Sequence, residues 1–146
     1  MDNDKLQKAL KVAFASEFSF YLKAHNFHWN VEGALFQQFH ELFGNIYEEV
    51  YGSIDDFAEN LRKTGAYAPG SLAKFNMLTA IDDETEVPDA QTMCETLLAD
   101  SEKMAEILKM TFQISEEFNE YGLSDFIAGR LDAHRKHSWM LRSTLK

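Results

Sequence analysis

Hydrophobic residues recur every three or four positions along most of this 146-residue chain, which is the spacing of amphipathic α-helices. The pattern predicts long helices over residues 4–28, 35–63 and about 89–118. A fourth helix is expected to begin at Ser124–Asp125, because Ser and Asp are common N-cap residues. Residues 71–78, in the long connection after residue 63, fit one short additional helix. Two helices, a long connection and two further helices predict an all-α four-helix bundle with one crossover.

The composition favours a single domain over residues 1–146, with 45% hydrophobic residues and only seven glycines and two prolines. Acidic residues outnumber basic residues by 24 to 14, which gives a formal net charge of −10. This charge disfavours binding of nucleic acid through the general surface and favours the attraction of cations. The single cysteine, Cys94, excludes an internal disulfide. The N-terminal sequence has no leader pattern and no stretch reaches membrane-spanning length, so we expect a cytoplasmic protein with no membrane association.

A second face of the predicted helix over residues 35–63 carries side chains with metal-binding chemistry. At about 100° per residue, His40, Tyr51, Asp55 and Glu59 all lie away from the apolar stripe. A solvated polar face is the ordinary interpretation of such a pattern. However, Asp55 and Glu59 stand at i and i+4, where like charges repel each other, and a shared cation would remove this repulsion. Imidazole and carboxylate together suit iron, zinc or manganese better than calcium.

The length of this helix decides which of these residues can meet. His40 and Asp55 are fifteen residues apart, or about 22 Å along a continuous helix, whereas metal–ligand bonds are only about 2 Å long. His28 ends the first helix beside the start of the second, so it can join His40. A single centre that contains His28, His40, Asp55 and Glu59 therefore requires two antiparallel subunits across a two-fold interface.

Two other interpretations of the histidines stay open. His25 and His28 also fit core side chains, or a helix C-terminus at which a charged imidazole interacts well with the helix dipole. A metal site within one bundle is not expected, because such sites use Glu-x-x-His pairs and no glutamate of this chain has a histidine three residues later.

Several stretches of the chain resemble the Dps proteins, the miniferritins of prokaryotes. These are HNFHWNVEGALFQQFHELF at residues 25–43, SIDDFAENLRKTG at residues 53–65, APGSLAKF at residues 68–75 and HSWMLRSTL at residues 137–145. The shared pattern is His-Trp-Asn-Val-x-Gly, then Phe-His-Glu twelve residues after the first histidine, then Asp-x-x-Ala-Glu before a glycine. The likeness covers nearly the whole chain and implies a ferritin-like four-helix bundle.

The resemblance implies a hollow shell of twelve subunits that oxidises Fe(II), preferably with hydrogen peroxide, stores the Fe(III) inside and protects the cell from oxidative stress. By position, His28, His40, Asp55 and Glu59 match the ferroxidase ligands, which in this family come from two subunits at the two-fold interface. Trp29 matches a tryptophan beside the site, an electron donor and radical sink. Asp125 matches an acidic residue near the pore on the three-fold axis, although it also fits a helix cap. His25 occurs in only part of the family and stays outside the predicted ligand set.

The sequence departs from the family pattern at two places. Gly44 stands where the family usually has an aspartate four residues after the second histidine, so the second iron position lacks a ligand unless Glu48 or water completes it. The Lys-rich N-terminal tail of the DNA-binding members is absent from the stretch before the predicted first helix. Two alternatives to a ferroxidase stay open: a nucleoid DNA-binding protein, and a shell whose degenerate centre holds zinc or little metal.

Overall fold

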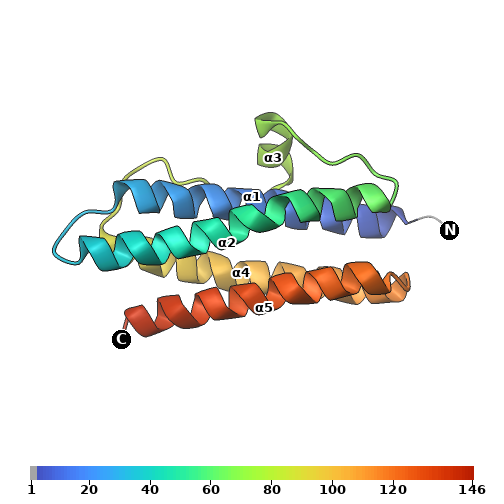
Figure 1. Ribbon diagram of the computed structural model, residues 1–146. Helices are drawn as coiled ribbons and strands as arrows, with labels where there is room; N and C mark the ends of the chain where they lie inside the picture. Colours follow the sequence, from blue (N-terminus) through green and yellow to red (C-terminus); the bar gives the residue numbers. More distant parts are fainter. Residues whose placement is uncertain (1–2) are drawn as a thin grey trace.

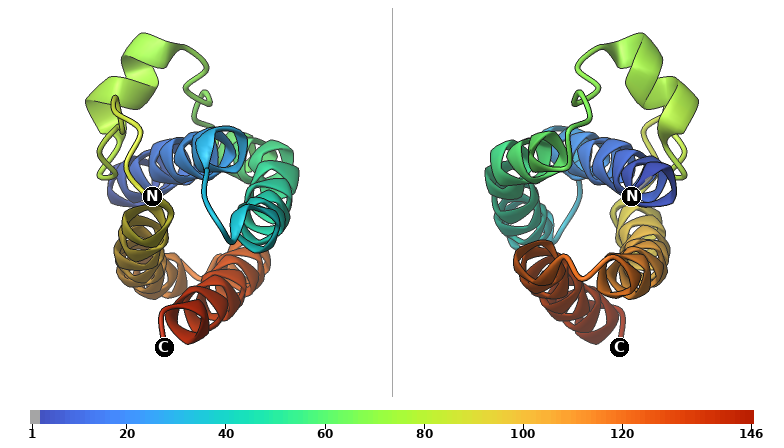
Figure 2. Two further views of the ribbon diagram at one scale, coloured as in Figure 1. Left: turned by 90° about the vertical axis from the view of Figure 1, so that its left-hand side faces the viewer. Right: turned by 90° about the vertical axis from the view of Figure 1, so that its right-hand side faces the viewer.

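A computed structural model describes residues 3–146 and contains five helices over that range (Figure 1). They are α1 (Asp4–Asn30), α2 (Phe36–Lys63), α3 (Leu72–Leu78), α4 (Ala90–Glu117) and α5 (Tyr121–Thr144). The four long helices form a bundle, and the short α3 lies outside it against α1 (Figures 1 and 2). The predicted all-α four-helix bundle with a short extra helix in the crossover is confirmed. No helix in the described part is long and apolar enough to span a membrane.

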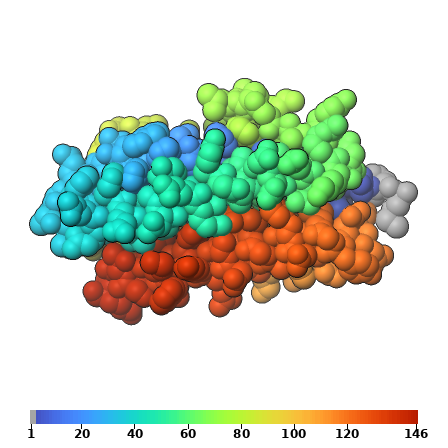
Figure 3. All heavy atoms as spheres, in the orientation of Figure 1, coloured from blue at the N-terminus to red at the C-terminus, as the bar shows by residue number. Residues whose placement is uncertain are grey.

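The helices pack as two antiparallel pairs, α1 with α2 and α4 with α5, and α1 also packs along α4. The contact between α2 and α5 is much less extensive, although the two helices lie side by side across one face of the molecule (Figure 3). The core between the pairs is formed by fully buried side chains from all four long helices, and the largest of them include Phe20, Phe27, Phe43, Phe57, Leu97 and Met104.

The helix ends agree closely with the predicted ones except at the start of α5. Ser71 and Asp89 cap α3 and α4 by accepting the backbone N–H groups of Lys74 and Thr92. α5, in contrast, begins at Tyr121, so the prediction of a start at Ser124–Asp125 was wrong. Ser124 is buried, with its hydroxyl 2.6 Å from that of Ser115.

Asp125 consequently lies within α5 rather than at its cap, and its side chain is exposed. The interpretation of Asp125 as an N-cap residue is therefore wrong, whereas its assignment near a three-fold pore stays a prediction. Cys94 is buried in the core, where burial raises the pKa of its thiol to about 11, helped by the nearby Glu95. Cys94 therefore serves as an apolar packing residue.

Candidate metal centre

His28 and His40 hold each other in a reciprocal arrangement at the junction of α1 and α2. Nδ1 of His28 lies 2.7 Å from the backbone oxygen of His40, and Nδ1 of His40 lies 2.7 Å from the backbone oxygen of His28. The two rings stack with centroids 3.8 Å apart and planes 16° apart. A carbonyl oxygen only accepts hydrogen bonds, so each Nδ1 must carry the proton. This leaves Nε2 of each ring as the nitrogen that can bind a metal ion, as in most histidine metal sites.

Gly44 is the residue that lets the His28 ring lie against α2. A Cβ atom at position 44 would stand 3.0 Å from Nδ1 and 3.1 Å from Cε1 of His28, which is closer than an ordinary van der Waals contact. Gly44 is itself buried within α2. Its lack of a side chain therefore has a packing consequence that the sequence did not reveal, in addition to the missing ligand.

The predicted carboxylates gather at a second place on α2. Carboxylate oxygens of Asp55, Asp56 and Glu59 all lie within 4.8 Å of one another, and all three side chains are exposed. They form the one group in residues 3–146 of three or more acidic, histidine or cysteine side chains with ligand atoms at such distances. Asp56 was not among the predicted ligands, although its position next to Asp55 was a visible signal.

The structure does not bring the histidine pair and the carboxylates together within one chain. Both groups lie on α2, which is unbroken from Phe36 to Lys63, so His40 and Asp55 are separated by about 22 Å of helix. Each group alone is an incomplete ligand set that faces outward. A joint centre requires a second copy of the chain.

Trp29 and Glu48 lie beside the histidine pair on the surface. Trp29 has 58% of its surface exposed, and its ring centroid is 4.0 Å from that of His25. Burial and the neighbouring His28 lower the pKa of His25, and exposed Glu48 opposes this shift through its negative charge. A role for Glu48 as a metal ligand stays a prediction.

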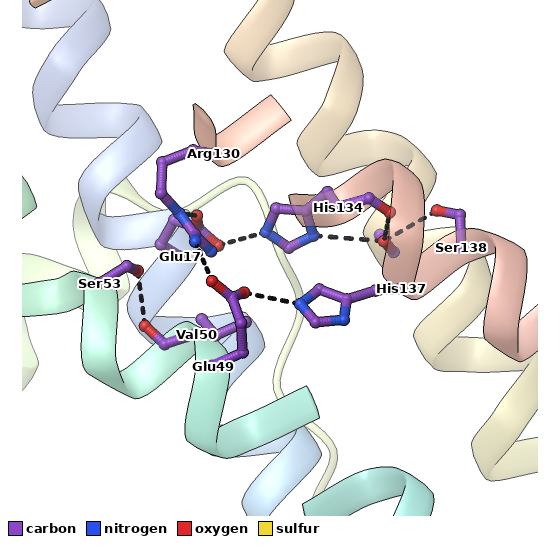
Figure 4. Close-up of polar contacts among 9 residues, drawn as sticks. Glu17, Glu49, Val50, Ser53, Arg130, His134, His137 and Ser138 are labelled. Atoms are coloured by element: carbon purple, nitrogen blue, oxygen red, sulfur yellow. Dashed lines mark hydrogen bonds and ion pairs between the residues drawn. The ribbon is translucent and has the colours of Figure 1, made fainter. Parts of the chain in front are cut away.

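A second group of histidines and carboxylates lies between α1, α2 and α5, mostly buried but with Glu49 exposed at its edge, and we call it the internal polar cluster (Figure 4). It consists of Glu17 from α1, Glu49 from α2, and Arg130, His134 and His137 from α5. Nε of Arg130 is 2.8 Å from Glu17 and its Nη1 is 2.6 Å from Glu49. Nε2 of His134 is 2.6 Å from Glu17, and Nε2 of His137 is 2.7 Å from Glu49. Five side chains thus tie three helices together.

The internal polar cluster shifts the acidity of its members. Burial acts to raise the pKa of Glu17, but the charges and hydrogen bonds of His134 and Arg130 outweigh it and lower that pKa. In the same way, hydrogen bonds from His137 and Arg130 overcome partial burial and lower the pKa of Glu49 to about 2. Burial lowers the pKa of His137 against the opposing effect of Glu49. Both carboxylates are therefore ionised at neutral pH and are neutralised by their neighbours.

This cluster has the residue types of an in-bundle metal site, but its arrangement does not fit a metal ion. The Arg130 guanidinium bonds to both carboxylates and supplies the positive charge there. Both histidines direct Nε2 at carboxylate oxygens, so these nitrogens are engaged. The expectation that no Glu-x-x-His metal site lies within the bundle stays a prediction.

Sequence reasoning missed the internal polar cluster, in which Arg130 is only 4% exposed. A signal was present. On α5 the cluster positions fall on the same stripe as buried Ile127 and Leu141, at steps of three and four residues, and Glu17 falls on the stripe of buried Leu10, Ala13 and Phe20. Charged residues in phase with a core stripe indicate a buried ion pair.

Comparison with known proteins agrees with this fold. The family description of the ferritin-like domain matches residues 7–146. The chain is 31% identical over 126 residues to the DNA protection during starvation protein of Brevibacillus brevis, covering 86% of this chain and 85% of that protein. It is 29% identical to DNA protection during starvation protein 2 of Bacillus anthracis, with 98% of both chains covered.

A solved structure gives the same result. The crystal structure of a Dps protein from Bacillus brevis superposes with a TM-score of 0.94 at 28% identity, and the match covers 99% of this chain and 97% of that one. The four-helix architecture, the short α3 and the sequence identity agree with one another. The chain belongs to the Dps family of ferritin-like proteins.

Proposed function

We propose that this chain is a ferroxidase and iron-storage protein that oxidises Fe(II) with hydrogen peroxide, O2 serving as the slower oxidant. Copies assemble into a closed shell, of twelve subunits as in the Dps family, and the Fe(III) product is kept inside. Iron is thus the substrate and the stored cargo. Each centre takes His28 and His40 from one subunit and Asp55 and Glu59 from its two-fold partner, with Trp29 beside it.

The observation that carries the proposal is the reciprocal bonding of His28 and His40. Two imidazoles fixed by backbone carbonyls, with both Nε2 atoms left free, form half of a metal site. The outward carboxylates of Asp55 and Glu59 form a complementary half. Across a two-fold axis, the histidine pair of each subunit would face the carboxylates of the other. Each dimer would therefore contain two equivalent centres.

The residues have distinct chemical roles in this proposal. The neutral imidazoles of His28 and His40 supply nitrogen ligands that hold Fe(II) without adding charge, whereas the carboxylates of Asp55 and Glu59 neutralise the additional charge of Fe(III). Gly44 provides no ligand, so one iron position per centre is expected to bind tightly and a second weakly.

Complementation between variants tests the shared centre. One chain carries His28→Ala and His40→Ala, the other carries Asp55→Asn and Glu59→Gln, and each alone is expected to lack tight Fe(II) binding and peroxide-driven oxidation. After co-assembly in equal amounts, half of the two-fold pairs are mixed, and each mixed pair has one intact centre of two. About a quarter of the centres should therefore be restored.

Restoration of Fe(II) oxidation to that level supports the shared centre, whereas no restoration in confirmed mixed shells contradicts it. Binding without oxidation by the unmodified protein would instead favour the alternative of a degenerate centre that holds zinc or another redox-inert ion. An anaerobic Fe(II) titration followed by addition of peroxide separates these two results.

DNA binding is not part of the proposal, although two relatives are named for DNA protection. The chain has a net charge of −10, and nonspecific binding to DNA depends on Lys and Arg contacts with phosphates. We expect no retained duplex in a gel-shift experiment at about 150 mM salt. A retained complex that weakens as salt rises would contradict this expectation and favour the nucleoid-binding alternative.

A further inference from the structure

Polar aromatic side chains from α1 and α2 adjoin the histidine pair. The His25 ring stacks on Tyr47 with centroids 3.7 Å apart and planes 8° apart, and it also contacts Trp29 at 4.0 Å. Tyr47 in turn lies 5.2 Å from the His28 ring. These contacts form an unbroken path of aromatic rings from a predicted iron ligand to His25.

Tyr21 makes a hydrogen bond with His25, the residue at the end of this path. Its hydroxyl oxygen lies 2.9 Å from Nδ1 of His25, and its ring centroid lies 4.9 Å from that of Tyr51 and 6.2 Å from that of Tyr47. Burial, together with the neighbouring hydroxyl groups of Tyr51 and Tyr47, raises the pKa of Tyr21. Tyr21 is therefore a neutral phenol, and its hydroxyl is within hydrogen-bonding distance of an imidazole nitrogen.

From this geometry we propose that Tyr21, with His25 as its proton acceptor, supplies the second electron when hydrogen peroxide is reduced at the His28–His40 centre. The inference rests on the proposed ferroxidase function and deepens it. It gives a role to Tyr21 and His25, which lie outside the ligand set.

The need for such a donor follows from Gly44. Hydrogen peroxide takes two electrons to become water, and one Fe(II) ion gives only one. A centre with two filled iron positions supplies both electrons at once. Gly44 leaves the second position short of a ligand, so a centre that holds one iron requires another electron source to avoid releasing a hydroxyl radical.

The step balances with Tyr21 as that source. One Fe(II) and the Tyr21 phenol each lose one electron, and hydrogen peroxide takes both electrons with two protons from solvent to give two water molecules. The products are Fe(III), a neutral phenoxyl radical on Tyr21 and a protonated His25, which holds the proton lost by the phenol. A second Fe(II) then reduces the radical while His25 returns the proton. Two Fe(II) ions are thus oxidised per peroxide, one after the other.

Tyr21 is a better donor than its neighbours because loss of an electron from a phenol requires a place for the proton. Within residues 3–146, the indole N–H of Trp29 and the hydroxyl groups of Tyr47 and Tyr51 make no side-chain hydrogen bond. A neutral radical on any of the three, including the Trp29 donor that the family resemblance implies, would have to release its proton to solvent. The base beside Tyr21 selects it as the site where the radical rests.

The first experiment uses the assembled protein loaded anaerobically with one Fe(II) per centre, mixed with peroxide and frozen within milliseconds. Electron paramagnetic resonance should show a tyrosyl radical, and ring-deuterated tyrosine should change its hyperfine pattern. The signal should be lost in Tyr21→Phe, with free hydroxyl radical appearing in a spin-trap assay instead. It should persist in Tyr47→Phe, which keeps the stacked ring, and in Tyr121→Phe, which alters an exposed tyrosine at the opposite end of the bundle (Figure 1).

The second experiment needs no iron. A photogenerated ruthenium(III) complex oxidises the metal-free protein after a laser flash, and the tyrosyl radical is followed by its absorption. Its yield should fall in Tyr21→Phe, and its formation should slow in His25→Gln and lose its dependence on deuterated solvent. Far-ultraviolet circular dichroism confirms that each variant is folded.

The outcomes separate this inference from the proposed function. Oxidation of two Fe(II) per peroxide with no tyrosyl radical, and with Tyr21→Phe unchanged, overturns the inference and leaves the ferroxidase intact. Failure to oxidise iron at all overturns the ferroxidase, and the metal-free experiment then decides the inference. An equal yield of radical in Tyr21→Phe and the unmodified metal-free protein overturns the assignment to Tyr21.

Discussion

The internal polar cluster and the His28–His40 pair use the same kinds of side chain for opposite purposes. In the internal polar cluster, each Nε2 nitrogen meets a carboxylate oxygen and Arg130 supplies the neutralising charge. In the His28–His40 pair, both Nδ1 atoms donate hydrogen bonds to backbone carbonyls, and neither Nε2 atom bonds to a carboxylate or a carbonyl. Within residues 3–146, the first group pairs its buried polar atoms inside a single chain except for Nη2 of Arg130, whereas the other has free ligand atoms.

The comparison shows that residue type alone does not identify a metal site. Two histidines three residues apart on one helix occur in both regions, as His25 and His28 on α1 and as His134 and His137 on α5. What differs is how many hydrogen-bonding and charge requirements the surrounding chain already meets. A buried group must meet them all, whereas an outward-facing group at a helix junction can leave ligand atoms for an ion.

Removing Arg130 should give the largest effect on stability. Arg130→Met leaves Glu17, which is fully buried, with His134 as its remaining ion-pair partner, and breaking a buried ion pair by removing one member costs about 3–5 kcal/mol. The midpoint of guanidinium unfolding of the metal-free protein measures this loss. Arg135→Met is the matched control, because Arg135 is an exposed residue on the same helix and should change stability by less than about 0.5 kcal/mol. Equal midpoints for the two variants would contradict the internal ion pair.

Metal affinity should respond to a change in the His28–His40 pair but not to a change in the internal polar cluster. His28→Ala removes a ligand and should weaken Zn(II) binding to the metal-free shell by more than the roughly 10–100-fold typical of lost supporting contacts. His137→Gln, in the internal polar cluster, should leave Zn(II) affinity unchanged and reduce stability instead. Isothermal titration with Zn(II) and thermal unfolding of both variants check this pair. Loss of Zn(II) binding in His137→Gln would place a metal in the bundle.

Lowering the pH should weaken the internal polar cluster in two stages. The folded pKa of His137 lies below its ordinary 6.5, so the unfolded chain binds a proton more readily and stability falls as the pH drops below about 6.5. The folded pKa of Glu49 is lowered from 4.5 to about 2, so its contribution is present above pH 4.5 and is lost as the pH falls toward 2. Unfolding midpoints between pH 8 and 3 measure both stages, and His137→Gln should remove the first one.

The fold was predictable because its signals are local. Periodicity along each helix acts within a few residues of the sequence, as do the capping side chains of Ser71 and Asp89 that the structure shows. The start of α5 was missed because Ser124 resembles a cap, while its hydroxyl actually bonds to Ser115 of α4 across the turn. The prediction of His28, His40, Asp55 and Glu59 as ligands also rests on spacing along single helices, and it stays a prediction.

The pairing of residues within the internal polar cluster, unlike their burial, was beyond sequence reasoning for the complementary reason. Glu17 and Arg130 are separated by 113 positions, and their pairing depends on how α1 and α5 turn toward each other in the bundle. The His28–Gly44 contact was missed on the same grounds, because it depends on the angle at which α1 meets α2. Residues on the core stripe are predictable, but their partners require the packed structure.

Substitutions of Gly44 should give the smallest effects, and they test how the packing of His28 against α2 supports the His28–His40 pair. Gly44→Ala places a Cβ at 3.0 Å from Nδ1 of His28, so the His28 ring must move by a few tenths of an ångström and its bond to the His40 carbonyl should lengthen. We expect Zn(II) affinity to fall by about tenfold, which is typical of a disturbed supporting contact. The stability of α2 should nevertheless rise by roughly 0.5–1 kcal/mol, because alanine favours helix more than glycine. Affinity and stability therefore change in opposite directions.

Gly44→Asp places a Cβ against His28, as Gly44→Ala does, and also adds a carboxylate. The difference in Fe(II) binding between the two variants therefore isolates the effect of the missing ligand. The family pattern predicts that the added oxygen tightens the second iron position and speeds oxidation by peroxide. The close approach of His28 predicts that the first position weakens, as it does with alanine. An Fe(II) titration measures both effects. The unmodified protein should show one tight and one weak binding step, and Gly44→Asp should show two steps of more similar affinity. If Gly44→Asp and Gly44→Ala bind Fe(II) identically, a carboxylate at position 44 does not reach the iron in this protein. A complementary loss of the second event in Glu48→Ala would then identify Glu48 as the ligand that replaces it.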